Sequence, residues 1–303
     1  MGTISEIRLK KEAECRTKAL SYGLLGKLHW ENAEWPAKAL ELLLKAIGLW
    51  RRGVRNILDI RLEEVEVRLS RLPEAFDGTR LLWISDIHVD KIDGQTERIL
   101  EILAPLTWDY GVFGGDSCFD HHVTEKAAQR TGRIAAVLAA KAPAFAVLGN
   151  HDYEPIVPVL NDAGVKVLLN ENVLLERDGQ KLCILGVDDC HYFKADDLDL
   201  AARGVDPGLC KILLCHSPEI FKKAAELGID LYLCGHTHGG QIRLPGGFAP
   251  VTCAKVPKSL VRGLWAFNGM AGYTSGGAGG SGAPVRFNCP PEITLFTLKK
   301  GQG

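Results

Sequence analysis

The segment LYLCGHTHGGQ, residues 231–241, joins a short apolar run to two histidines set among glycines. LYLC has the length and composition of a buried strand. The GHTHGGQ that follows contains too much glycine for a stable helix or a strand interior. Nine histidines occur in the 303 residues, and two of them lie here. This clustering at the end of a predicted strand indicates a functional site rather than a surface turn.

Four other apolar runs end in the same way. In open α/β sheets, ligands bind beyond the carboxyl ends of the strands, so we expect the polar residues that follow these runs to converge on one rim. These residues are Asp86 and His88 after LLWIS, Asp116 after YGVFGG, Asn150, His151 and Asp152 after AFAVLG, His216 after KILLC, and His236 and His238 after LYLCG.

The chain from about residue 62 alternates short apolar runs with helix-like stretches near 95–104, 123–141 and 217–227. This alternation predicts an α/β fold whose strands are buried on both faces. Residues 269–291 are rich in glycine and proline, and we expect them to form a loop before a last strand, EITLFTL.

Residues 1–60 differ from the rest because they are helix-like, mildly basic and contain tryptophan. We predict a helical extension over 1–60 and one α/β domain over 61–303. The segment from Ala37 to Asn56 places five apolar side chains near one face. It is either a helix packed on its own domain or a basic amphipathic element that lies on an anionic membrane surface or an amphiphilic ligand. The five side chains are Leu40, Leu43, Leu44, Ile47 and Val54.

Composition limits the partners and the compartment. The formal net charge of −1 provides no global positive field to attract nucleic acid, so no nucleic-acid partner is expected. The nine cysteines include no C-x-x-C pair, and Cys183, Cys215 and Cys234 lie in apolar runs, as reduced core residues of a cytoplasmic protein do. The N-terminus has no signal-peptide core, and no apolar run approaches the ~18 residues of a membrane span. We expect a cytoplasmic protein, with a peripheral position on the inner face of the membrane as the alternative.

The side-chain types at the strand ends favour metal ions. Imidazole, carboxylate and amide oxygen suit a borderline or hard divalent cation, whereas a structural zinc site usually uses thiolates. Seven candidate ligands are too many for one ion but fit two ions that share a carboxylate and lie ~3.5–4 Å apart. Gly239 and Gly240 are expected to let His236 and His238 face different ions and to leave room for a substrate.

The ordered motifs D-x-H, GGD, GNHD, a single histidine and GHTH resemble those of the calcineurin-like metallophosphoesterases from about residue 80 to residue 240. SDIH, LGNHD, HSPE, GHTHGGQIRLP and the ending PVRFNCPPEITLFTL are similar to the YkuE-like bacterial branch. That branch includes UDP-2,3-diacylglucosamine pyrophosphatases of lipid A synthesis. The resemblance implies a four-layer α/β/β/α sandwich with mixed sheets at its centre.

The same resemblance implies roles for individual residues. Asp86, His88 and His238 would hold one ion, and Asn150, His216 and His236 would hold the other. Asp116 would bridge the two ions. His151 would stabilise the phosphoryl oxygens or protonate the leaving oxygen, with Asp152 as its partner. Manganese is the first choice for both ions, with iron, zinc and magnesium as alternatives.

Three functions remain open. The first is hydrolysis of a phosphodiester or pyrophosphate bond by metal-activated water, with UDP-2,3-diacylglucosamine, split into UMP and a lipid monophosphate, as one such substrate. The second is a soluble phosphomonoesterase or phosphodiesterase that acts on a non-lipid substrate. The third is a scaffold that keeps the fold without catalysis. The motif SCFDHH departs from the branch pattern, in which a basic residue often follows GD, and so weakens the lipid assignment.

Six further residues lie near the motifs. Arg243 and Arg286 are candidates to grip a second phosphate through a bidentate fork, and surface ion pairing is the alternative for each. The other four have no place in the metal scheme and are expected around the site or on the surface: Asp120, His121, His122 and His191.

Overall fold

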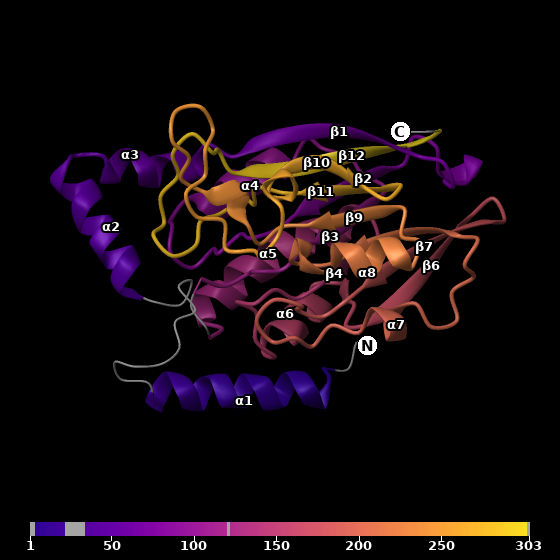
Figure 1. Ribbon diagram of the computed structural model, residues 1–303, viewed down its shortest axis with the longest axis horizontal. Coiled ribbons are helices and arrows are strands. Elements are labelled where there is room, and N and C mark those ends of the chain that lie inside the picture. The colour runs from indigo at the N-terminus through magenta and orange to yellow at the C-terminus, as the bar shows by residue number, and fades with distance from the viewer. Residues whose placement is uncertain (1–3, 22–33, 120–121, 302–303) are drawn as a thin grey trace.

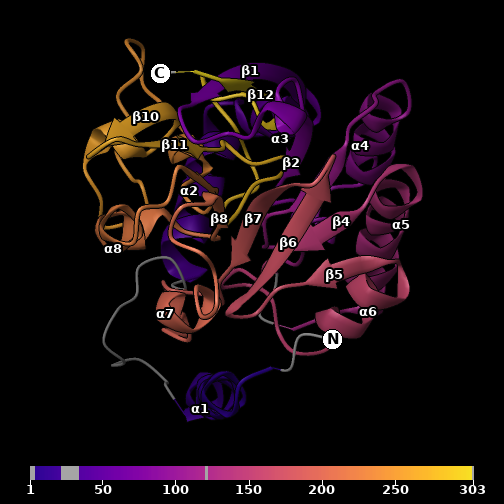
Figure 2. The same ribbon diagram turned by 90° about the vertical axis from the view of Figure 1, so that its right-hand side faces the viewer.

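A computed structural model describes residues 4–21, 34–119 and 122–301 of the chain. Its centre is a pair of six-stranded sheets that face each other (Figure 1, Figure 2). In spatial order the first sheet contains β1 (Arg61–Leu69), β12 (Glu292–Lys300), β2 (Arg80–Ile84), β3 (Tyr110–Phe113), β4 (Ala144–Ala146) and β5 (Val165–Val167). The second contains β10 (Gly263–Phe267), β11 (Met270–Thr274), β9 (Leu231–Cys234), β8 (Cys210–Leu214), β7 (Gln180–Gly186) and β6 (Glu171–Arg177).

Both sheets are mixed. In the first, β2, β3, β4 and β5 run parallel, and β12 pairs antiparallel with β2. In the second, β7, β8, β9 and β11 run parallel, and β6 and β10 are antiparallel edge strands. Because the carboxyl ends of parallel strands lie on one side of a sheet, each sheet presents one rim for polar loops.

Helices cover the outer face of each sheet. Within a strand, successive side chains point to opposite faces, so Leu81 and Trp83 enter the core between the sheets while Leu82 and Ile84 enter the core beneath the helices. The helices over the first sheet are α4 (Gln95–Leu103), α5 (Glu125–Lys141) and α6 (Ile156–Asp162), and those over the second are α7 (Leu198–Ala201) and α8 (Phe221–Glu226). The predicted four-layer α/β/β/α sandwich is confirmed.

The last third of the chain contains more regular secondary structure than was predicted. The glycine-rich segment 269–291 was expected to be a loop, but β11 occupies its first residues, which makes that expectation wrong there. Gly272 permits this strand because a Cβ at that position would lie 2.2 Å from the ring of Trp265 on β10. The glycine therefore reflects close packing between paired strands rather than a turn.

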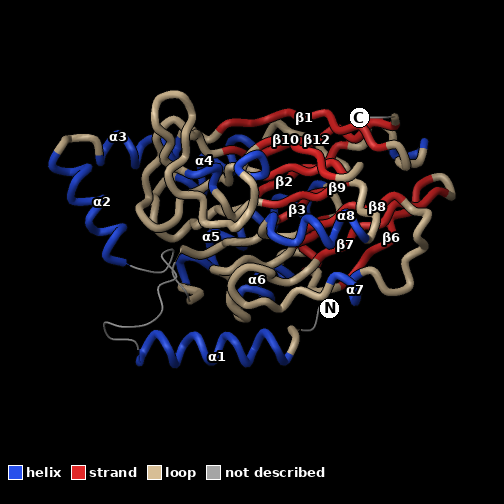
Figure 3. Tube along the Cα trace, in the orientation of Figure 1, coloured by secondary structure: helices blue, strands red, loops and turns tan. Residues whose placement is uncertain are grey.

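Three helices precede the first strand: α1 (Glu6–Ser21), α2 (Glu34–Ala46) and α3 (Trp50–Arg55). Leu44 of α2 is buried against Ala283 and Val285, which belong to the tail that precedes β12. Leu43 and Ile47, expected on the same face, are each 56% exposed, so only part of this face packs on the domain. The irregular tail lies beside α2 and α3, and much of it is tan in Figure 3.

Shorter 3-10 turns complete the fold at Asn56–Leu58, Glu74–Phe76, Pro218–Ile220, His238–Gly240 and Lys258–Leu260. None of the helices in the described ranges has the length and apolar character that crossing a bilayer requires. Cys183, Cys215 and Cys234 are fully buried free thiols, as expected of core cysteines.

Gly53 of α3 provides a test of how firmly this helix packs on the domain. A Cβ at Gly53 would lie 2.7 Å from Val285 Cβ and 2.8 Å from the Phe287 ring. In a free helix, Gly→Ala stabilises by roughly 0.5–1 kcal/mol, whereas overpacking a tight contact costs about 1–3 kcal/mol. We expect Gly53→Ala to lower the free energy of unfolding by about 1–3 kcal/mol in urea denaturation. The exposed neighbour Arg52→Ala should stay within about 0.5 kcal/mol, and a stabilised Gly53→Ala would contradict the packing.

Candidate metal centre

Six of the predicted ligands form two clusters at the facing rims of the sheets. The ligand atoms of Asp86, His88 and His238 all lie within 4.8 Å of one another, and so do those of Asp116, His216 and His236. The loops after β2 and β3 supply residues from the first sheet, and the loops after β8 and β9 supply residues from the second. The predicted convergence is confirmed, and His236 and His238 belong to different clusters.

Asp116 lies between the two clusters. Its Oδ2 is 3.2 Å from His216 Nε2 and 3.7 Å from His88 Nε2. Its Oδ1 accepts a hydrogen bond of 2.9 Å from the backbone N–H of His151. One carboxylate oxygen thus faces both clusters while the other is fixed by the backbone, which is the position that a bridging ligand requires.

Buried polar atoms at the centre fit a metal pair. Asp86 Oδ2, Asn150 Oδ1 and His236 Nε2 are all buried and make no hydrogen bond to the described residues. Buried polar atoms are nearly always partnered, so several unpartnered atoms at one place require another ligand. Nitrogen and oxygen donors of this kind suit borderline or hard divalent cations. Asn150 directly precedes His151, whose backbone N–H donates to Asp116 Oδ1, so its loop borders the centre.

Five residues of the two clusters adopt the left-handed backbone conformation. Their φ angles are 51° for Asp86, 42° for His88, 57° for Asp116, 67° for His236 and 49° for His238. Residues other than glycine rarely adopt this region, and such strain tends to persist where a site needs it. Here the sharp reversal after each strand turns the side chain back toward the centre between the sheets.

Glycines beside the ligands make room for the carboxylates. A Cβ at Gly149 would lie 2.1 Å from Asp116 Oδ1, and one at Gly235 would lie 2.2 Å from Asp86 Oδ2. Gly239 and Gly240 were expected to form a tight turn and to leave room for a substrate, and only the turn is found. Their φ angles of 59° and 83° do form the turn, but protein atoms fill the space beside them. A Cβ at Gly240 would lie 2.4 Å from Ala249 Cβ, so this space is not left for a substrate.

Burial sets the protonation of the imidazoles. It lowers the pKa of His88 to about 3 and holds the pKa values of His236 and His238 well below the ordinary histidine value. These three rings are therefore neutral near pH 7, the form that binds metal. Burial also opposes a charge on His216, but Asp116 and Asp86 outweigh it and raise the pKa of His216 well above the ordinary value. A cation that binds there displaces the His216 proton.

His151 lies beside the centre, with its ring centroid 5.1 Å from that of His88. Its Nδ1 is 2.9 Å from the carbonyl oxygen of Phe119, so this carbonyl orients the ring. Asp152 was expected to be the partner of His151, and that expectation is wrong. The Asp152 carboxylate instead accepts the backbone N–H groups of Asp116, Ser117 and Gly149, at 2.7, 2.8 and 2.9 Å.

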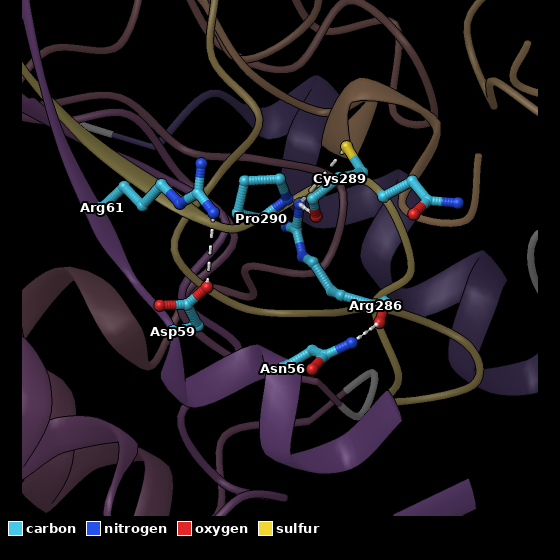
Figure 4. Close-up of a pocket in the computed structure, with 7 residues that line it drawn as sticks. Asn56, Asp59, Arg61, Arg286, Cys289 and Pro290 are labelled. Carbon is cyan, nitrogen blue, oxygen red and sulfur yellow. Dashed lines mark hydrogen bonds and ion pairs between the residues drawn. The ribbon is translucent and has the colours of Figure 1, made fainter. Parts of the chain in front are cut away.

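The two candidate phosphate-binding arginines differ in their surroundings. Arg243 is partly exposed, and its Nε donates to the Gly239 carbonyl at 2.7 Å. Arg286 is fully buried and lines a pocket together with Asn56, Asp59 and Arg61 (Figure 4). All three of its guanidinium nitrogens donate to backbone carbonyls: Nε to Gly279, Nη1 to His238 and Cys289, and Nη2 to Gly276 and Gly277. The expectation that Arg286 grips a phosphate is therefore corrected, because this arginine ties the glycine-rich tail to the His238 loop.

Residues beyond the metal scheme also reach the centre. The ring of His191 is 4.2 Å from that of His236, and its Nδ1 is 3.1 Å from Glu219 Oε2. His122 is exposed, and Asp120 and His121 lie outside the described residues. His191 follows Asp188 and Asp189 in the loop after β7, so the strand-end rule applied to KLCILGV would have found this loop as well.

Comparisons with known proteins agree with this geometry. The family model for calcineurin-like phosphoesterases matches residues 79–240. The metallophosphoesterase YkuE of Bacillus subtilis is 31% identical over 249 residues, which cover 79% of this chain and 86% of YkuE. YpbG of the same organism is 32% identical over 223 residues, covering 72% and 80%. The phosphodiesterase YaeI of Escherichia coli is 34% identical over 171 residues, covering 53% and 60%.

The family match spans every ligand of the two clusters, from Asp86 to His238. A metal-dependent hydrolase built on a four-layer sandwich accounts for the fold, for the buried histidine and aspartate clusters and for these sequence matches together. The chain belongs to the calcineurin-like phosphoesterase family.

Proposed function

We propose that this enzyme hydrolyses a phosphodiester or pyrophosphate bond with the help of two divalent cations. The observation that carries the proposal is the pair of histidine and aspartate clusters on either side of Asp116. A single cation would need only one such cluster, and two-metal sites serve in-line displacement at phosphorus. The likeness to YaeI, which is named as a phosphodiesterase, favours diesters over monoesters.

When bound, the two cations would activate water as the nucleophile and offset the negative charge that builds at phosphorus. The chain's own residues supply position and protons. Asp86, His88 and His238 would hold one cation, and Asn150, His216 and His236 would hold the other, with Asp116 between them. The Phe119 carbonyl fixes one ring nitrogen of His151 as a donor, so a protonated ring presents its other N–H to the phosphoryl or leaving oxygen.

An amphiphilic substrate is the finer proposal. Leu42 and Leu43 of α2 are 67% and 56% exposed, and Ile47, just after this helix, is 56% exposed. The basic residues Arg51 and Arg52 follow on exposed positions of α3. Exposed apolar and basic side chains together suit an anionic lipid surface or a lipid-linked substrate. UDP-2,3-diacylglucosamine is one such substrate, and a soluble phosphate ester is the alternative, for which α2 has a structural role only.

The test compares three substrates with manganese present. Release of nitrophenol from bis-p-nitrophenyl phosphate, faster than from p-nitrophenyl phosphate, is expected of a diesterase. Release of UMP from UDP-2,3-diacylglucosamine would establish the lipid-linked substrate. Good diester hydrolysis without UMP would reject that substrate and keep the reaction type, whereas no hydrolysis of any of the three by metal-loaded protein would reject the proposed function.

Removal of metal should both inactivate and destabilise the protein. A ligand that binds only the folded state at 100 times its Kd stabilises it by about 2.7 kcal/mol, so a chelator should lower the melting temperature as well as abolish hydrolysis. Readdition of manganese should restore both, and elemental analysis should find two ions per chain. A melting temperature that neither the chelator nor added manganese, iron, zinc or magnesium changes would contradict the metal centre.

Substitutions at Asp116 and His151 should separate metal binding from catalysis. Asp116→Asn keeps the shape of the side chain but removes the charge between the clusters, so the second ion should bind at least roughly 10–100-fold more weakly. His151→Asn should retain two ions and lose roughly 10²–10⁴-fold in kcat, because only proton donation is removed.

The matched control for these variants is Asp162→Asn, which neutralises an exposed aspartate at the end of α6. It should keep the wild-type kcat and metal content. The kcat and the metal content of each variant are measured together to separate a role in metal binding from a role in catalysis. Near-normal turnover in both Asp116→Asn and His151→Asn would contradict the assigned roles.

A further inference from the structure

Over residues 6–14, whose side chains the structure describes, helix α1 contacts the domain through charged side chains rather than apolar ones. Arg8 is fully buried and Glu12 is 3% exposed, whereas Ile7 and Leu9 are 58% and 45% exposed. A helix on a protein surface normally turns its apolar side chains inward. The first turns of α1 do the reverse, so hydrophobic burial does not explain their position, and the partners of Arg8 do.

The Arg8 guanidinium lies between two loops. One nitrogen forms an ion pair with the carboxylate of Asp188, which is itself completely buried. The other terminal nitrogen donates to the backbone carbonyl of Asp152 and, at 3.3 Å, to that of Gly149. The guanidinium carbon lies 3.8 Å from the centre of the Phe193 ring.

Glu12 completes the attachment one helical turn later. Its Oε1 accepts a hydrogen bond of 2.8 Å from Arg8 Nε, and its Oε2 accepts one of 3.1 Å from the backbone N–H of Glu154. The pair therefore acts as a unit in which Glu12 orients the arginine and also contacts the chain just beyond Asp152.

These contacts join the two sheets at the rim that carries the metal centre. Gly149 and Asp152 lie in the loop after β4 of the first sheet, and Asp188 lies in the loop after β7 of the second. The metal ligands are divided in the same way, since Asp116 comes from the first sheet and His216 from the second. Arg8 therefore bridges the two rims whose separation sets the distances between the ligands within each cluster.

The contacts of Asp152 continue from Arg8 to the bridging carboxylate. While its carbonyl accepts from Arg8, its side chain accepts the backbone N–H groups of Asp116 and Ser117. The N–H of the adjacent His151 donates to Asp116 Oδ1. A shift of the Asp152 backbone thus moves Asp116 and His151 together.

We infer that Arg8 of helix α1 is a positioning residue of the metal centre, holding the Gly149–Asp152 loop and the Asp188 loop in register across the two sheets. This inference rests on the proposed function for its effect on turnover. The fork of the guanidinium matters because it reaches acceptors on both loops at once, which the single ammonium of a lysine does not do. Arg8 acts through Asp152 and Asp188 and touches no reacting atom.

The test compares Arg8→Ala with Lys10→Ala, which removes the same charge from an exposed position of the same helix. With two metal ions bound, Arg8→Ala should lower kcat for bis-p-nitrophenyl phosphate roughly 10–100-fold, because small displacements of catalytic groups have effects of this size. The KM should change little. Added guanidinium at non-denaturing concentration should restore part of the kcat by filling the vacated space, and sodium chloride at equal ionic strength should not.

Hydrogen–deuterium exchange provides a readout that requires neither metal nor turnover. Arg8→Ala should speed exchange at the backbone amides of Asp116, Ser117 and Gly149, whereas Lys10→Ala should leave them protected. If the wild-type protein hydrolyses no diester, the proposed function fails, and the exchange experiment still decides the role of Arg8.

The role would be overturned by a folded Arg8→Ala protein that keeps wild-type kcat and wild-type exchange at these amides, even with a lower melting temperature. That result would make Arg8 a mere anchor for α1. If Arg8→Ala does not fold, Arg8→Lys takes its place with Lys10→Arg as control. We expect Arg8→Lys to exchange faster at the same amides and to turn over more slowly, and wild-type behaviour in both measurements would reject the inference.

Discussion

The structure depends on holding buried carboxylates and imidazoles of two sheets within a few ångströms of one another. Removing such groups from water costs free energy, because like charges repel one another and polar atoms lose their hydrogen bonds to water. A ligand or a well-placed neighbour has to offset this cost. In this chain, burial keeps His88, His236 and His238 neutral, while the proton on His216 offsets part of the negative charge of Asp86 and Asp116. The centre is thus prepared for cations before they bind.

Precise placement of these groups comes from backbone geometry more than from side-chain packing. Five residues of the two clusters reverse the chain in the left-handed region shortly after a buried strand. Gly149 and Gly235 allow the carboxylates to approach the backbone, and the Asp152 carboxylate collects the amides that fix the Asp116 loop. The strands form a rigid rim, and the strained turns at their ends direct the side chains toward the centre between the sheets.

Two buried arginines attach the outer segments of the chain to this rim. Arg286 fastens the tail before β12 to the carbonyl of His238, and Arg8 joins helix α1 to the loops that contain Asp152 and Asp188. A buried guanidinium is stable only when its donors are satisfied, so each arginine specifies the position of the carbonyls around it. The two ends of the sequence therefore become part of the support of a centre to which neither contributes a metal ligand.

The sequence by itself determined the α/β class, the ends of the buried strands and the aspartates and histidines that form the two clusters. All three follow from local patterns. An apolar run followed by Asp or His predicts a buried strand with a polar loop at its end, and this prediction does not depend on where the strand lies in the fold. Tertiary structure alone decided the rest. Asp152 binds amides of the loop that contains Asp116 instead of His151, space beside Gly240 is filled by Ala249, and β11 forms within a glycine-rich tail because Trp265 covers Gly272. Arg8 is separated from Asp188 by 180 residues, and no local pattern distinguishes it from the exposed lysines beside it. Its partner depends on how the two sheets pack, and that is a property of the whole chain.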